Sequence, residues 1–183
     1  MVDSGSPIKA LDVWKERNFA WYMGGSTIAL VGMWLQRVAL FWLAWELTHS
    51  ERWLGFLAFA DLFPTVVITP LAGALADRMS RLNMARVSHA VAVLQAFALA
   101  WLAMTGRLSQ PDDVWWLLGL TFILGLAMAF ATAARLAMVP DLIEARFLPA
   151  ALANDAAIFN AARMVGPMAA AFIITHWGAG IAF

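Results

Sequence analysis

The stretch VWWLLGLTFILGLAMAFATAARLAMV, from Val114 to Val139, decides the class of this protein. Arg135 is its only charged side chain, and its polar and apolar residues do not alternate as they do in a barrel strand. A helix that crosses the hydrocarbon core of a bilayer needs about 20 predominantly apolar residues. Because only helices and closed barrels satisfy their backbone hydrogen bonds in lipid, the stretch is predicted to be a membrane-spanning helix.

Four further stretches have the same character. Of the 183 residues, 63% are hydrophobic and 13% are charged, whereas a soluble domain is about 45–50% apolar and about 25% charged. Short segments rich in turn-forming and charged residues separate the stretches. We therefore expect an all-α membrane protein, a polytopic helical bundle in the lipid bilayer, preceded by a polar N-terminal segment at residues 1–18. The predicted spans are about 19–47, 53–76, 87–104, 114–139 and 149–177.

The charges and reactive side chains exclude several functions. Twelve Lys and Arg balance twelve Asp and Glu, so no basic field is present that would bind nucleic acid. The chain has no cysteine, its three histidines are isolated, and it contains neither a G-x-S-x-G nor an H-E-x-x-H motif. We expect no enzyme activity, no metal site and no cofactor.

The distribution of cations predicts the orientation in the membrane. Cytoplasmic loops of membrane proteins carry an excess of Lys and Arg. With the N-terminus inside, the outer loops hold only Arg52 and Arg107. The cytoplasmic segments then hold Lys9, Lys15, Arg17, Arg78, Arg81, Arg86, Arg135 and Arg146. A cytoplasmic N-terminus is therefore predicted.

Two motifs carry a resemblance to a known family. The loop GALADRMSR, from Gly73 to Arg81, resembles the G-x-x-x-D-R-x-G-R signature loop of the major facilitator superfamily, with Ser80 in place of a glycine. ARMVGPMAA, in the fifth predicted span, is similar to the proline–glycine motif of the family's antiporters. The chain from about Asn18 to Thr175 resembles the bacterial branch that contains the enterobactin exporter and multidrug effluxers.

The resemblance implies a multi-pass secondary transporter of the bacterial inner membrane. Such a protein exports a small amphipathic molecule, siderophore or drug-like, in exchange for protons by alternating access. Members have twelve spans in two halves, so the chain would be five spans of the N-terminal half, with residues 178–183 beginning a sixth. Its expected partners are then substrate, protons and the missing C-terminal half or an equivalent. The alternative is a truncated, non-transporting membrane module that acts by assembling with a partner half.

Two opposite charges are predicted at similar depth in the first two spans. By helical rise, Arg37 lies about 15 Å and Asp61 about 12 Å below the outer end of its helix. An ion pair is expected, with Gln36 able to hydrogen-bond either partner. The pair either only locks two helices together or, when Asp61 takes up a proton, releases Arg37 for substrate.

The fifth span carries a second polar face. Asn160, Arg163 and Pro167 follow one another at steps of three and four, on one side of a helix. Gly166, with alanines four residues before and after it, forms a small-residue face suited to close helix packing. This region is either a packing seam with a kink or the gate where two transporter halves meet.

A charge cluster is expected at the cytoplasmic side. Arg135, near the end of the fourth span, and Asp155, near the start of the fifth, can join the signature loop. Gly73 would allow close helix approach there. The resemblance implies a latch that closes the cytoplasmic side, and the alternative is a solvated rim of little energetic consequence. The residues assigned to it are Gly73, Asp77, Arg78, Arg81, Arg135, Asp141, Glu144 and Asp155.

Overall fold

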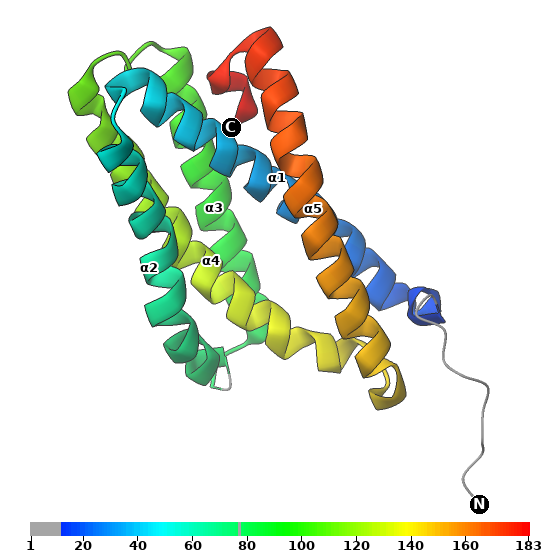
Figure 1. Ribbon diagram of the computed structural model, residues 1–183. Coiled ribbons are helices and arrows are strands. Elements are labelled where there is room, and N and C mark those ends of the chain that lie inside the picture. Colours follow the sequence, from blue (N-terminus) through cyan, green and yellow to red (C-terminus); the bar gives the residue numbers. More distant parts are fainter. Residues whose placement is uncertain (1–11, 77) are drawn as a thin grey trace, which may run out of the picture.

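The computed structural model describes residues 12–76 and 78–183, so the signature-loop residue Asp77 lies outside the described residues. Within them the chain forms helices and no strand, which confirms the all-α prediction. The long helices run lengthwise through one bundle, in which α1 crosses α3 obliquely (Figure 1). They are α1 (Arg17–Thr48), α2 (Glu51–Ala76), α3 (Arg81–Met104), α4 (Val114–Leu142) and α5 (Leu148–Trp177); short 3₁₀ turns are η1 (Asp12–Lys15), η2 (Pro111–Asp113), η3 (Ala145–Phe147) and η4 (Ala179–Ala182).

The long helices extend beyond some of the predicted spans. Helix α3 begins at Arg81, before the span predicted at about 87–104, and Ser80 caps it: the Ser80 hydroxyl accepts a hydrogen bond from the Asn83 backbone N–H at 3.4 Å. A serine hydroxyl at this position satisfies a free helix N–H group. Helix α4 continues through Pro140, directly after the predicted span 114–139, and ends at Leu142.

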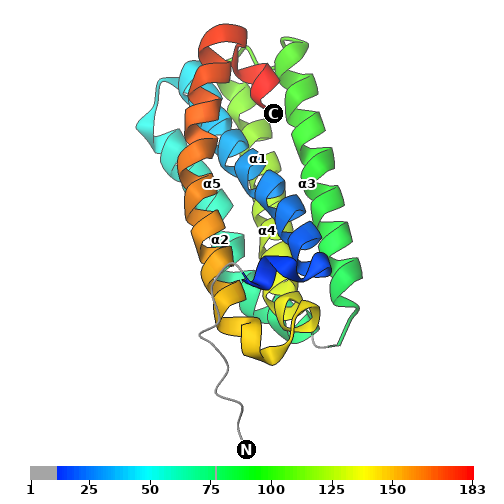
Figure 2. The same ribbon diagram turned by 90° about the vertical axis from the view of Figure 1, so that its right-hand side faces the viewer.

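The helices pack in two groups. Helix α4 lies along both α2 and α3, and α1 lies along α5 (Figure 2). Two glycines permit the closest approaches. A Cβ atom at Gly125 of α4 would lie 2.7 Å from the carbonyl oxygen of Asp61, and one at Gly166 of α5 would lie 2.5 Å from the Cβ of Trp34. Small residues of this kind let helix backbones touch inside a membrane.

Apolar clusters join the two groups near both ends of the bundle. One cluster brings together Leu40, Leu57, Leu99 and Leu117 from four helices. At the opposite end, Val13 of η1 is fully buried in a second cluster with residues of α1, α4 and α5. The closing turn η4 packs against the first cluster. That residues 178–183 begin a further span stays a prediction.

The outward surface is apolar. Trp21, Val66, Leu94 and Phe97 each expose about 70% of their surface, at 77, 71, 69 and 70%. Exposed apolar patches of this extent mark a surface that contacts lipid or another protein. All five long helices are long and apolar enough to cross a membrane.

Candidate functional site

Arg37 and Asp61 form an ion pair between α1 and α2, with 2.7 Å between Nη2 and Oδ2. The Asp61 side chain is 7% exposed and the Arg37 side chain 26% exposed. A tight turn sets this alignment, because His49, in the left-handed region at φ 45°, reverses the chain directly after α1. Residues equally far from that turn then face each other on the two antiparallel helices.

The backbone of α4 packs closely against the backbone of α2 at Asp61. Pro64 has no N–H group to bond the carbonyl oxygen of Ala60, one helical turn earlier. A Cβ at Gly125 would lie 3.1 Å from that oxygen and 2.7 Å from the oxygen of Asp61. Thr65 also donates its hydroxyl hydrogen to the Asp61 carbonyl, at 3.3 Å. The backbone position of Asp61 is therefore fixed by the α2–α4 contact.

Gln36 does not bond to the ion pair, so that expectation was wrong. Its Nε2 donates to Oε1 of Gln95 on α3 at 2.6 Å, and both residues are buried. Successive side chains on a helix point about 100° apart, so Gln36 turns toward α3 while Arg37 turns toward α2. The Nε2 of Gln95 has no hydrogen-bond partner among the described residues. The sequence did not lead us to predict a role for Gln95, although it is the only residue with an amide side chain in the apolar third predicted span.

A tryptophan brings a second arginine to the same place. The Arg37 guanidinium carbon lies 4.7 Å from the ring centre of Trp34, and that of Arg163 lies 5.7 Å from it. Phe159 meets the Trp34 ring edge-on at 5.9 Å. Arg163 is exposed, and it makes no ion pair within the described part of the chain. The two predicted regions of spans one and five thus share one indole ring.

An open groove runs along this side of α1 and α5. It has a volume of about 530 Å³, and Arg37 supplies its charge. Pro167 of the fifth-span motif lies in its wall, and Gly166 lies beside it against α1. Its lining residues are Trp34, Arg37, Val38, Phe41, Trp42, Trp45 and Pro167.

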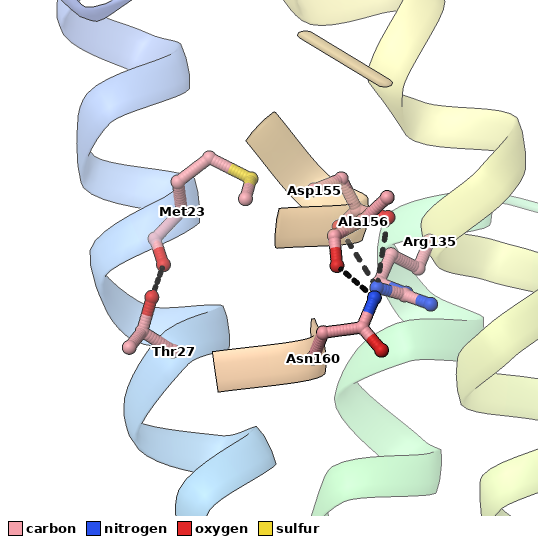
Figure 3. A network of polar contacts seen from close by, with 6 residues as sticks. All are labelled: Met23, Thr27, Arg135, Asp155, Ala156 and Asn160. Carbon is pink, nitrogen blue, oxygen red and sulfur yellow. Dashed lines mark hydrogen bonds and ion pairs between the residues drawn. The ribbon is translucent and has the colours of Figure 1, made fainter. Parts of the chain in front are cut away.

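Asn160 does not join this groove through a side-chain bond to Arg163. Its amide donates instead to the carbonyl of Ala156, one turn earlier on its own helix, at 2.8 Å (Figure 3). Thr27 of α1 likewise bonds to its own helix, at the carbonyl of Met23. The side-chain amide of Asn160 is therefore already hydrogen-bonded within α5. On the helix face formed by Asn160, Arg163 and Pro167, the charged residue is Arg163.

The residues assigned to the cytoplasmic latch form separate pairs. Arg135 of α4 donates to both carboxylate oxygens of Asp155 on α5, at 2.8 and 3.0 Å (Figure 3). Arg81 pairs with Asp141 at 2.6 Å and donates to the Ala137 carbonyl at 2.9 Å, which joins α3 to α4. The first pair is largely buried and the second is exposed.

Three other latch residues lie elsewhere. Glu144 pairs with Arg146 in the exposed η3 turn at 2.7 Å, rather than with the signature loop. Arg78 is exposed at the α2–α3 turn. A Cβ at Gly73 would meet nothing within 4 Å, so its expected role in close helix approach was wrong. Small size matters at Gly125 and Gly166 instead, where the helices do touch.

Metal-binding side chains are dispersed in the described residues. No group of three or more His, Asp or Glu there lies close enough together to hold an ion. The polar groups that do gather are arginines, carboxylates and amides between helices, which suits binding and conformational change.

Five long apolar helices with charged pairs between them make this an integral, multi-pass membrane protein. Residues 9–183 match the family of transmembrane secretion effectors, MFS_3, and the chain belongs to this family of the major facilitator superfamily. The resemblance to that superfamily is thereby confirmed. The family points to a membrane transporter rather than an enzyme.

One curated relative is the staphyloferrin A transporter of Staphylococcus aureus, which is 24% identical over 163 residues. The match covers 89% of this chain and 40% of the relative, so the chain spans about two fifths of that protein's length. No solved structure matches the chain significantly.

Proposed function

We propose that this chain is the N-terminal part of a proton-coupled exporter that moves a small amphipathic molecule, siderophore or drug-like, by alternating access. The observation that carries the proposal is the Arg37–Asp61 pair, which lies within two spans and borders an open groove. Charges inside a membrane span are costly, and they mark substrate or proton pathways. The transporter family of the chain and its siderophore-transporting relative support the same reading.

The ion pair offers a simple means of coupling. The Asp61 carboxylate can hold either Arg37 or a proton, and the two states exclude one another. When a proton neutralises Asp61, the Arg37 guanidinium is left beside Trp34, at the wall of the groove. Substrate from the cytoplasm then binds the freed guanidinium while Asp61, protonated from outside, releases its proton to the cytoplasm. Release of the substrate outside restores the pair. A ligand shifts such a balance only by its different affinity for the two states.

The cytoplasmic pairs would set the other half of the cycle. With the N-terminus in the cytoplasm of a bacterium and the chain in its inner membrane, the Arg135–Asp155 and Arg81–Asp141 pairs lie at the cytoplasmic end. Holding those helix ends together favours a state that is closed on that side. Alternating access also needs a second helical half, which packs over the α1–α5 face.

Transport in inside-out vesicles tests the proposal. The protein is expressed from its complete gene, with any partner half that the gene or a neighbouring one encodes, and is offered staphyloferrin A and ethidium. We expect accumulation of at least one probe, abolished by a protonophore. Asp61→Asn should remove the dependence on the proton gradient, whereas Asp112→Asn, in the exposed η2 turn, should not.

The opposite outcomes are equally clear. Accumulation that ignores the protonophore, or that keeps its response to the gradient in Asp61→Asn, would contradict proton coupling at this residue. If neither probe moves while the chain inserts and co-purifies with a partner, the result favours the non-transporting membrane module.

A further inference from the structure

We infer that the α1–α5 groove binds a carboxylate-bearing amphipathic molecule, with Arg163 as the site of the carboxylate. The inference rests on the proposed function for the presence of a substrate, and deepens it by assigning the substrate's charge. It starts from an imbalance: two guanidinium groups lie against the Trp34 ring, and the structure gives one of them a carboxylate.

The charges in and beside the groove define this imbalance: Arg37 lies in its lining, and Arg163 lies beside it at the Trp34 ring. Arg37 is neutralised by Asp61 of α2, whereas Arg163 is exposed in the middle of α5 without an ion pair in the described chain. Glu46 lies about 13 Å farther along α1, where the Trp42 indole N–H holds its carboxylate at 2.8 Å. One uncompensated positive charge therefore lies beside the Trp34 end of the groove, where it attracts an anion and repels a cation.

The setting of Arg163 fits a ligand better than lipid. A guanidinium at mid-span is energetically unfavourable in hydrocarbon. Trp34 holds this group by a cation–π contact, which orients the charge and does not neutralise it. The planar fork of an arginine matches the two oxygens of a carboxylate. Arg163 is thus positioned to receive a carboxylate from outside the chain.

The rest of the groove lining indicates the character of the ligand beyond its carboxylate. From Arg37 toward the end of α1, the wall is made of apolar and aromatic side chains, including Phe41, Trp42 and Trp45. Its volume of about 530 Å³ is within the range of roughly 300–1,000 Å³ that holds a drug-sized molecule. The expected ligand has a carboxylate at one end and an aromatic or apolar body at the other.

Binding of two matched dyes tests the inference without any transport. The chain is placed in phosphatidylcholine nanodiscs and titrated with dansylglycine, which has a carboxylate, or dansylamide, which is neutral. Energy transfer from tryptophan to dansyl reports binding. We expect dansylglycine to bind about tenfold more tightly, the size of one charge-assisted hydrogen bond. Arg163→Gln should remove this preference and leave the affinity for dansylamide unchanged.

The controls separate a specific site from general charge. Arg107 also lies over an indole ring, 4.8 Å from the centre of Trp101, but outside the groove. Arg107→Gln should therefore keep the preference. Arg163→Lys keeps the charge and loses the fork, so it should retain part of the preference, and it serves as the test if Arg163→Gln does not fold.

Three results would overturn the inference: equal affinity for both dyes in the unaltered chain, a preference that survives in Arg163→Gln, or, if that variant does not fold, a full preference in Arg163→Lys. The proposed function fails separately. A carboxylate preference without proton-dependent transport would reject the exporter and leave this inference standing.

Discussion

Trp34 of α1 and Gly166 of α5 touch so closely that a Cβ atom at position 166 would lie 2.5 Å from the Cβ of Trp34. The same added atom would lie 3.0 Å from the carbonyl oxygen of Val31. These neighbours are backbone or the first side-chain carbon, so neither can move without moving α1. The ring that carries both guanidinium groups is therefore positioned by the absence of a side chain on the opposite helix.

Gly166→Ala should push α1 and α5 apart and destabilise the protein by about 1–3 kcal/mol, the usual effect of overpacking. Thermal unfolding in detergent measures the change. Gly32→Ala on α1 is the matched control, because a Cβ there meets nothing within 4 Å. That control should be neutral or slightly stabilising, since alanine favours a helix over glycine. Equal stability of the two variants would contradict the close contact.

Neutralising one member of the Arg37–Asp61 pair should be worse than neutralising both. Arg37→Gln or Asp61→Asn alone leaves an unpaired charge between helices, and removing one partner of a buried pair is unfavourable by roughly 3–5 kcal/mol. The double variant should recover much of that loss in detergent stability. If the pair is only structural, the double variant also recovers transport. If Asp61 carries the proton, stability returns and pH-dependent export stays lost.

The exposed Arg81–Asp141 pair provides the comparison for that cycle. Its side chains are 37 and 60% exposed, so either single change should alter stability by no more than about 1 kcal/mol. If the double variant loses as much stability as the Arg37→Gln and Asp61→Asn variants lose together, the two residues do not interact.

The Gln36–Gln95 bond predicts a different pattern. Gln95→Leu removes the only partner the structure gives to Gln36 Nε2, and it should destabilise by about 1 kcal/mol. The Gln36→Leu plus Gln95→Leu variant removes both amides, and it should be as stable as the original protein or more so. Denaturation in mixed micelles compares them. A double variant that is less stable than either single one would mean that these amides bind something else.

Labelling of single cysteines tests the orientation, because the chain contains no cysteine of its own. Met79 and Ser109 are exposed in the turns at opposite ends of α3. Met79→Cys should react with an impermeant maleimide only after the membrane is opened, and Ser109→Cys should react in intact cells. The reverse pattern would place the N-terminus outside.

The sequence predicts the number and approximate place of the helices because apolar length is a local property. It also predicts the Arg37–Asp61 pair, since a tight turn aligns two helices by simple counting. It does not predict Gln95 as the partner of Gln36, or Trp34 as the ring shared by Arg37 and Arg163. Those contacts depend on how each helix is rotated against its neighbours, which packing at Gly125 and Gly166 determines and no local pattern records.

The bundle also resists sliding. Polar side chains connect α1 to α2, α1 to α3 and α4 to α5, and each bond demands one alignment of the helices it joins. A shift of α1 by one turn, about 5.4 Å, would break its two bonds together, and small shifts would already strand buried donors. Movement of α1 along its neighbours is therefore all-or-none and occurs in steps of one helical turn. The helix has discrete positions along its axis rather than a continuous range of positions. The bonds that define the present position of α1 are Arg37–Asp61 and Gln36–Gln95.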